Sequence, residues 1–460
     1  MLMMPVEEWS RQTFGGCKLG DKRRTERLVK VARGLAGRVG QSLVKSCVSE
    51  AEIEGAYRLL RNEQVDCNAI AESGYKACAE QATLSRTLLA LEDSTSLSYG
   101  HGVREELGPV GGEAESQSQG FMVHSVLLVD EETQHTVGLI EQQRWKRRAE
   151  EHGKKPQRKQ RRYEEKESYK WERASRAMSE RLGELMSRTI SVCDRESDIY
   201  DYLKYKIGAG QRFIVRASQN RRIGGEANGR LFELTGQLQS AGSYDITVPQ
   251  KGGRRARKAK MELRTAAVTL VSPKQGHRAL SLNVVECREV GTGQGKGLKW
   301  TLLTQEPVRS AEQAREIVSH YEQRWRIEEF HLAWKSGGTQ VEKQRMQTAD
   351  SLERMSVMLA FVAVRLLQLR EVVMDKVDAK QRSCTELLQP MEWKVLWLKR
   401  QRGKLPAKPP SLYWAYYAVA KLGGWHDSKR TGKVSWTPLW EGWFRLESMV
   451  EGAELAASLK

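Results

Sequence analysis

A chain of 460 residues is too long for one ordinary hydrophobic core, so its length predicts two or three domains. Hydrophobic residues make up 39% of it, which suits a packed globular protein, but no run of about 18 apolar residues exists to span a membrane. The formal net charge of +18 favours a polyanion as partner, because each phosphate that a protein neutralises releases counterions; a basic but inert surface is the alternative.

The first residues, MLMMPVEEWSRQ, lack the basic segment and apolar core of a secretory signal, so we expect a cytoplasmic protein. The 7 cysteines are scattered and are never spaced as C-x-x-C. Reduced thiols are therefore expected rather than a disulfide framework or a zinc site.

The pattern of roughly the first 66 residues predicts helices. Asp21 and Ser49 each precede an amphipathic stretch and are plausible N-caps. Arginines crowd both stretches: Arg23, Arg24, Arg27, Arg58 and Arg61. Short helices with clustered arginines are typical of a small DNA-binding module, although a solvated helix face would show the same pattern.

Strands are predicted from about residue 86 onward. The short apolar run TLLALEDS ends in acids, and FMVHSVLLVD and HTVGLIEQQRW follow as two strands around the turn-like EETQ. The stretch KRRAEEHGKKPQRKQRR, within residues 144–162, has hardly an apolar residue and is expected to be a flexible basic loop. A non-specific grip on phosphates and plain solvation are both open for it.

A helix over about 166–186 is predicted next, followed by the strand, acid and helix of TISVCDRESDIYDYL and by the strand RFIVRAS. Residues 219–307 have glycine-rich turns and short alternating runs without a convincing helix, which indicates a β-rich insert. Its GTGQGKG, residues 291–297, lacks the Lys-Ser/Thr ending of a phosphate loop and is interpreted as a turn. The order of elements predicts a mixed α/β sheet, with helices through the C-terminal residues.

Two of the predicted strands end in an acid, Asp93 after LLALE and Asp194 after TISVC. Ligands bind α/β sheets just beyond the carboxyl ends of strands. If these strands are neighbours, the two carboxylates repel each other, and a divalent cation relieves the repulsion; oxygen ligands select Mg²⁺ or Mn²⁺. Asp194 competes with Glu196 and Asp198 of the same DRESD, and an acid after an apolar run is often only a cap.

The stretch YEQRWRIEEFHLAWK, residues 321–335, is expected to form one helix. At about 100° per residue, one face carries Tyr321, Arg324, Glu328 and Lys335, whereas Glu329 points elsewhere. Glu328 is therefore the candidate third carboxylate of a two-ion site for in-line displacement at phosphorus, with Arg324 and Lys335 binding neighbouring phosphates. A simple surface pair between Arg324 and Glu328 is the alternative.

Three motifs together resemble the bacterial insertion-sequence transposases of the DDE class, most closely the Tn-five type. They are LEDSTSLSY around Asp93, CDRESDI around Asp194, and the spacing Y-x2-R-x3-E-x6-K from Tyr321 to Lys335. The resemblance covers almost the whole chain. It implies an RNase H-like mixed-sheet catalytic core in which Asp93, Asp194 and Glu328 are both the catalytic triad and the metal ligands.

The resemblance also implies a domain organisation. A helical DNA-end-binding domain would span residues 1–66, and the RNase H-like catalytic domain would span 67–370, with the β-rich insert at about 219–307. A helical domain over 371–460 would join two subunits into a homodimer, each binding one transposon end and cleaving the other.

In this family two Mg²⁺ ions per active site, for which Mn²⁺ can substitute, serve a cut-and-paste reaction. Water nicks the transposon end, the freed 3′-OH forms a DNA hairpin, a second water opens it, and the 3′-OH joins target DNA. Trp300 matches the tryptophan that stacks on the base flipped at the hairpin, where an aromatic face recovers about 1–3 kcal/mol. Judged alone, Trp300 on an apolar strand is more often a core residue.

Further DNA contacts are implied by position in the family motifs. Tyr321, Arg324 and Lys335 would position the end phosphates, and Arg216 and Arg345 match other backbone contacts. Arg23, Arg24 and Arg27 match the N-terminal end-recognition segment. The chain departs from its relatives at Ser218, where they carry a lysine, and in the loop 144–162, which is far more basic.

Two other functions are compatible with the residues. A metal-dependent nuclease would cut DNA without joining it, and an inactive DNA-binding regulator would bind transposon ends without cutting them. A complete set of three carboxylates and an N-terminal basic module disfavour the regulator. An active enzyme of this kind is expected in the bacterial cytoplasm, associated with the nucleoid when bound to DNA.

Overall fold

The computed structural model describes residues 4–111, 118–148, 161–224, 229–248, 256–272, 278–291, 297–401, 403–428 and 434–459. Most of the predicted basic loop, at 149–160, and most of the GTGQGKG turn, at 292–296, lie outside the described residues. The cysteines are free thiols, as predicted. Among the described residues, every helix is too short or too polar to cross a lipid bilayer.

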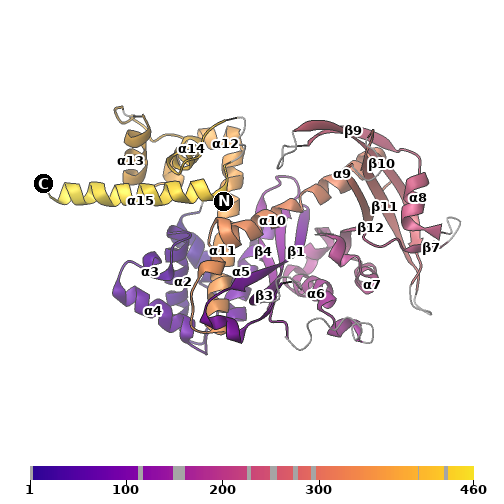
Figure 1. The fold of residues 1–460 in the computed structure, drawn as a ribbon, viewed down its shortest axis with the longest axis horizontal. Coiled ribbons are helices and arrows are strands. Elements are labelled where there is room, and N and C mark those ends of the chain that lie inside the picture. The colour runs from indigo at the N-terminus through magenta and orange to yellow at the C-terminus, as the bar shows by residue number, and fades with distance from the viewer. Residues whose placement is uncertain are drawn as a thin grey trace.

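Among the described residues before β1, all of the regular secondary structure is helical (Figure 1). The helices are α1 (Val6–Phe14), α2 (Lys22–Gly37), α3 (Leu43–Ser46), α4 (Glu50–Arg61) and α5 (Cys67–Ala82). The predicted caps are confirmed: Asp21 accepts a hydrogen bond from the amide of Arg23 at 2.8 Å, and Ser49 accepts one from the amide of Glu52 at 3.3 Å. Each cap satisfies an amide that the first turn leaves without a helical partner.

Twelve strands of the described residues form one mixed sheet. They are β1 (Leu88–Tyr99), β2 (Gly108–Pro109), β3 (Gln119–Asp130), β4 (Thr136–Trp145), β5 (Thr189–Cys193), β6 (Arg212–Arg216), β7 (Arg222–Gly224), β8 (Gly229–Arg230), β9 (Gly242–Val248), β10 (Arg257–Leu270), β11 (Leu280–Glu289) and β12 (Lys299–Thr304). Strand β1 pairs antiparallel with β3 and parallel with β5, β5 is parallel to β6, and β4 lies beyond β3. The predicted mixed α/β sheet is confirmed.

Helices cover both faces of the β1–β5 region. Ala90 and Val126 pack against Met178 of α6 (Lys170–Leu182). Leu91 and Leu127, on the opposite face, belong to the main core cluster together with residues of the later helices. A sheet buried on both faces needs strands that are apolar almost throughout, which is the pattern of TLLALEDS and FMVHSVLLVD.

The β-rich segment after β6 extends the same sheet. The chain runs through β7 to β12, and β12 pairs antiparallel with β6, so the sheet is continuous in the order β6, β12, β11, β10. Figure 1 shows these strands at the far side of the molecule from the N-terminal helices. The expectation of no helix in this segment is wrong, because α8 (Leu231–Gln237) lies between β8 and β9. Leu231 anchors this short helix in a second core cluster.

The expected single helix over 321–335 is also wrong. Helix α9 (Ala311–Glu322) ends near Tyr321, and a separate helix, α10 (Trp325–Leu332), carries Glu328. Between them the amides of Arg324 and Ile327 bond carbonyls only three residues back, at Tyr321 and Arg324, so the chain tightens and changes direction. A short π-helix, Ala333–Gly337, follows α10. Arg324 therefore lies at the junction of two helices.

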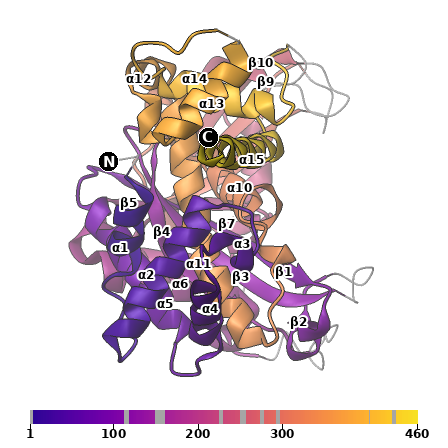
Figure 2. The same cartoon turned by 90° about the vertical axis from the view of Figure 1, so that its left-hand side faces the viewer.

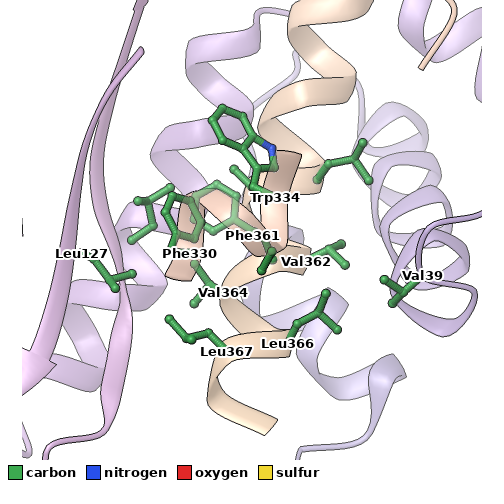
Figure 3. Packing of buried hydrophobic residues seen from close by; sticks show 14 of the residues in the cluster. Val39, Leu127, Phe330, Trp334, Phe361, Val362, Val364, Leu366 and Leu367 are labelled. Carbon is green, nitrogen blue, oxygen red and sulfur yellow. The ribbon is translucent and has the colours of Figure 1, made fainter. Parts of the chain in front are cut away.

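Helix α10 is fixed by its apolar side. Phe330 and Trp334 stack with ring centroids 6.0 Å apart, and the indole of Trp334 donates to the carbonyl of Ser356 at 3.1 Å. Ser356 lies in α11 (Ala349–Met374), and Figure 3 shows Phe330 and Trp334 packed beside Phe361 and its neighbours on that helix. Burial of large aromatic side chains on one side leaves Glu328 on another side of α10.

Helix α11 links the N-terminal and C-terminal helices. It contacts α2, α4 and α5, and it continues through residue 370, where the sequence suggested a domain boundary. The later helices are α12 (Lys376–Gln381), α13 (Pro390–Gln401), α14 (Leu412–Leu422) and α15 (Trp436–Ser458). Figure 2 shows them stacked above the N-terminal helices. One contiguous apolar cluster joins all these parts.

Candidate active site

The two predicted strand-end acids follow matched positions of neighbouring parallel strands. Glu92 of β1 is in register with Cys193 of β5, so Asp93 and Asp194 come next in each strand direction. Burial changes there: β1 is buried from Leu88 through Glu92 and half-buried from Asp93 to Ser96. The prediction that Asp93 ends its strand is wrong, because β1 runs on to Tyr99, whereas Asp194 does follow the end of β5. The side chains thus emerge at the carboxyl edge of the sheet.

Asp194, Glu196 and Asp198 of the DRESD motif have different surroundings. The side chain of Asp198 is fully buried and accepts hydrogen bonds from the guanidinium of Arg221 at 2.6 Å and from the amide of Ser218 at 2.7 Å. Glu196 is exposed and pairs with Lys170 at 3.1 Å. Asp194 is half-buried and accepts from the amide of Glu196 at 2.8 Å. Asp198 stabilises the local structure through these buried contacts. Asp194 is therefore the candidate functional acid at the end of β5.

Glu328 joins this group through Arg324. One guanidinium nitrogen of Arg324, Nη2, donates to Oε1 of Glu328 at 2.5 Å, and the other, Nη1, lies 3.7 Å from Oδ1 of Asp93. Glu329 instead lies 3.6 Å from Arg370, on another side of α10. The two adjacent glutamates therefore face different partners, and only Glu328 faces Asp93.

The pKa of Asp93 reports how the three acids interact. Burial raises this pKa to about 7; the charges of Asp194 and Glu328 act in the same direction, and the charge of Arg324 opposes them. The three carboxylates thus share one electrostatic environment. They are not yet gathered for an ion: within the described residues, they do not form a set with one oxygen of each within 4.8 Å of the other two.

His331 is a site residue that the sequence reading missed. Its Nδ1 lies 3.7 Å from Oδ2 of Asp93, and the imidazole is buried. Burial lowers the pKa of His331 to about 3, and the charges of Lys335, His124 and Arg324 act in the same direction. The signal was its position one helical turn after Glu328, on the same side of α10.

The remaining residues of the Tyr-Arg-Glu-Lys signature surround this edge. The ring of Tyr321 is buried; burial raises its pKa, and the charges of Arg216 and Arg324 oppose that shift. Arg216, at the end of β6, donates to the carbonyl of Lys299 at 3.3 Å. Lys335 lies 3.5 Å from Glu342. These groups are close to the acids, although the helix break separates Tyr321 from Glu328.

Trp300 is half-buried in β12, opposite Cys287 of β11. Its ring centroid lies 6.1 Å from that of Tyr321. Strand β12 also pairs with β6 beside Arg216. The indole is therefore at the rim of the same edge. Arg345 is exposed just beyond the short turn Val341–Lys343, on the chain that follows α10.

The N-terminal arginines divide into two kinds. Arg24 donates to the carbonyl of Leu19 at 2.9 Å, and the guanidinium of Arg27 lies against Gly55, where a Cβ would meet it. Arg24 is half-buried and Arg27 is exposed, and both side chains contact neighbouring segments. Arg23 on α2 is exposed. Arg58 and Arg61, on α4, are also exposed; Arg58 pairs with Glu54 at 2.9 Å, and Arg61 lies over the Tyr57 ring at 5.1 Å.

A second group of possible metal ligands lies at the opposite edge of the sheet. Ligand atoms of Glu131, Glu316 and His320 all lie within 4.8 Å of one another, and His320 Nε2 is 3.1 Å from Glu131 Oε1. The amide of Glu131 bonds the carbonyl of Thr87, just before β1 begins. This cluster could hold a metal ion, and the sequence reading missed it. The spacing of Glu316 and His320, one turn apart on α9, was the available signal.

Residues 6–65 match the family model described as transposase DNA-binding. The match covers α1 to α4 and stops before α5, so it includes the exposed arginines of both helices. It supports a transposase that binds DNA, and hence a DNA-processing enzyme. The large mixed sheet with helical ends is consistent with this class.

Proposed function

We propose that this chain is a cut-and-paste DNA transposase of the DDE class, similar to the Tn-five type. Asp93, Asp194 and Glu328 would be its catalytic, metal-binding carboxylates. The observation that supports this most is the strand register beside Asp93 and Asp194: two acids from separate motifs, one within β1 and one just after β5, come next to a matched pair of neighbouring parallel strands. Glu328, from a third motif, meets Asp93 through one guanidinium.

The sheet supports an RNase H-like core. Strand β3 is antiparallel to both of its neighbours, β4 and β1, and β5 and β6 continue in parallel with β1. The segment from β7 to β12 would be the insert of the family, since it leaves the core after β6 and returns before α9 and α10. The catalytic carboxylates would then come from β1, the end of β5 and the helix after the insert.

The donor set suits hard divalent cations. Carboxylate oxygens select Mg²⁺ and Mn²⁺. Burial, with a smaller contribution from the charges of Asp194 and Glu328, raises the pKa of Asp93, and a bound cation would offset both effects. Two such ions, when bound, would activate an attacking oxygen and stabilise the leaving oxygen at a phosphodiester. Asp93, Asp194 and Glu328 would hold them, and the burial of Asp93 would limit water at the reacting phosphate.

Other side chains would hold the DNA. Tyr321, Arg324 and Lys335 would position phosphates of the transposon end, assisted by Arg216 and Arg345. Attack by water would free a 3′-OH, whose oxygen would attack a phosphodiester of the opposite strand, closing a hairpin on the transposon end and releasing the flanking DNA as the leaving group. A second water would open the hairpin, and the same 3′-OH would join target DNA.

Trp300 would stabilise the hairpin step. Closing a hairpin bends the backbone sharply and forces a base out of its stack, and an exposed aromatic face recovers about 1–3 kcal/mol of that stacking. Its position at the rim, beside Tyr321, supports this role. The exposed arginines of α2 and α4 would bind the transposon end, and the C-terminal helices would join two subunits into a homodimer.

The test uses duplex DNA that carries the borders of the gene, incubated with the full chain and Mg²⁺. Hairpins and joined products support the transposase. Nicks alone indicate the nuclease, and bound but uncut DNA indicates the regulator. Binding to the duplex is expected to weaken steeply as salt is raised, since phosphate contacts release counterions; a flat response would contradict the polyanion partner.

A further inference from the structure

Arg324 lies in the part of the site that a cation would have to enter. Its guanidinium bonds Glu328 at 2.5 Å and points its other end nitrogen at Asp93, 3.7 Å away. Its side chain is 16% exposed, and Nη1 is buried with no hydrogen-bond partner within the described residues. One positive group therefore already lies between two of the proposed metal ligands.

This contact would compete with a metal ion for Glu328. A carboxylate oxygen that accepts a short bond from a guanidinium cannot give the same lone pair to a metal ion, and two cations a few ångströms apart repel each other. The separation of the three acids agrees with this, because their oxygens are not yet within 4.8 Å of one another. Metal binding through Oε1 of Glu328 has to break the contact between Arg324 and Glu328.

We propose that Arg324 is an internal competitor for the metal ions, which it excludes until a DNA phosphate takes it over. This rests on the proposed function, since it assigns the regulation of the same site. The planar guanidinium binds a phosphate as well as it binds a carboxylate, so the move exchanges one partner for another. Arg324 lies between the end of α9 and the start of α10, so its backbone is not inside either helix.

The consequence is coupling between two ligands. If DNA removes Arg324 from Glu328, DNA binding strengthens metal binding, and by reciprocity metal binding strengthens DNA binding by the same factor. Couplings of this kind are commonly about 5- to 150-fold. A chain without DNA would then hold its ions weakly, which limits cutting away from a bound end.

The first test measures Mn²⁺ affinity of the full chain without DNA, by calorimetry and by the electron paramagnetic resonance signal of free Mn²⁺. All chains compared, the otherwise unchanged one included, carry Glu316→Gln, which disables the second cluster of possible metal ligands. Arg324→Gln should bind Mn²⁺ at least about 5-fold more tightly than the unchanged chain. Arg309→Gln, which removes the same charge from an exposed position before α9, should bind like the unchanged chain. Equal or weaker binding by Arg324→Gln would overturn the proposal.

A third variant separates this failure from failure of the proposed function. Glu328→Gln should lose Mn²⁺ binding at the site. If its affinity equals that of the unchanged chain, the ions bind elsewhere and the assignment of the metal site is wrong, whatever Arg324 does. If Glu328→Gln loses binding while Arg324→Gln gains none, the metal site stands and only the competition is wrong.

A second measurement avoids substitutions altogether. Phenylglyoxal modifies accessible guanidinium groups, and peptide mass spectrometry locates the product. In the unchanged chain without DNA, Mn²⁺ should increase modification of Arg324, because the released side chain becomes accessible, and should leave Arg309 unchanged. Protection of Arg324 or no change on adding Mn²⁺ would overturn the proposal.

Discussion

Acidic side chains gather at both edges of the sheet, and the two groups differ in what surrounds them. At the amino edge, where β1 begins, ligand atoms of Glu131, Glu316 and His320 are already close together, and Glu316 is exposed. At the carboxyl edge, Asp93 and Glu328 are held apart around Arg324. The tighter cluster is the better ready-made metal site. The looser one has the basic and aromatic neighbours that a DNA phosphate and a flipped base require.

Under the proposed function, the difference between the two edges means that closeness of ligand atoms is a weak guide to catalysis. Under the same proposal, Arg324 is the positive charge that lies beside these carboxylates before DNA binds. At the amino edge, Arg212 is engaged by Glu306; that contact raises the pKa of Arg212, with smaller contributions from Glu316 and Glu131. At the carboxyl edge, by contrast, the ring of Trp300 lies beside that of Tyr321.

The largest expected effect separates the two edges directly. Glu328→Gln should lower the rate of DNA cleavage by about 10³-fold or more, equivalent to ~4 kcal/mol of transition-state stabilisation, because it removes a metal ligand. Glu131→Gln should change the rate by less than about 3-fold, within the range of ordinary surface changes. Rates are measured on the border duplex with Mg²⁺.

Glu329→Gln is the matched control for that comparison. It changes the neighbouring glutamate, which faces Arg370, and should be mild. DNA binding by Glu328→Gln should remain intact in a gel-shift assay. Full cleavage by Glu328→Gln, or equal losses in Glu328→Gln and Glu131→Gln, would refute the assignment of the carboxyl edge.

The next largest effects separate a residue that stabilises the fold, Asp198, from a proposed catalytic residue, Asp194, within the DRESD motif. Asp198→Asn should lower the free energy of unfolding by about 3 kcal/mol, because it leaves the largely buried Arg221 without its anionic partner. Asp194→Asn should abolish cleavage with little change in stability, since Asp194 is half-buried and caps only a short turn. Denaturant unfolding and cleavage assays on both variants check this pair, and a stable Asp198→Asn chain that cannot cut DNA would reverse the two roles.

Much of this edge could be predicted from the sequence because the signals are local. An acid that ends an apolar run predicts a strand end, and Asp194 follows that rule after β5. Asp93 does not, because β1 continues to Tyr99 and pairs Asp93 with Ser125 of β3. The roles within DRESD could not be separated, because Asp198 is identified by Arg221, 23 residues later. The break between α9 and α10 was missed because it depends on three-residue hydrogen bonds and on the anchoring of Phe330 and Trp334 by α11.

Other features were not predicted because they also depend on contacts between distant parts of the chain or on weak local patterns. His331 looks like a core residue of an amphipathic helix until Asp93 is placed beside it. The short helix α8 has only seven residues in a glycine-rich segment, where strand patterns dominate. Glu131 and His320 are 189 residues apart, so only the folded chain brings them together.

A smaller effect tests what the aromatic rim adds to the carboxyl edge. Trp300→Ala should slow hairpin formation about 10- to 100-fold, in line with the stacking of one base, and should slow the first nick much less. Single-turnover assays on the border duplex resolve the two steps. Trp300→Phe is the control that keeps an aromatic face. If nicking and hairpin formation slow equally, Trp300 is a packing residue of β12.

The smallest effect on activity is expected at the amino edge, where a metal ion would act on stability alone. One imidazole and two carboxylates suit Zn²⁺ or Mn²⁺, and an ion at 100 times its Kd stabilises the folded state by about 2.7 kcal/mol. Zn²⁺ should therefore raise the Tm of the unchanged chain in a thermal scan. Glu316→Gln should remove that rise, because it deletes one of three ligands, and should leave cleavage within about 2-fold. A Zn²⁺ shift that survives Glu316→Gln but disappears in Glu328→Gln would mean that the carboxyl edge, and not the compact cluster, is the stronger metal site even without DNA.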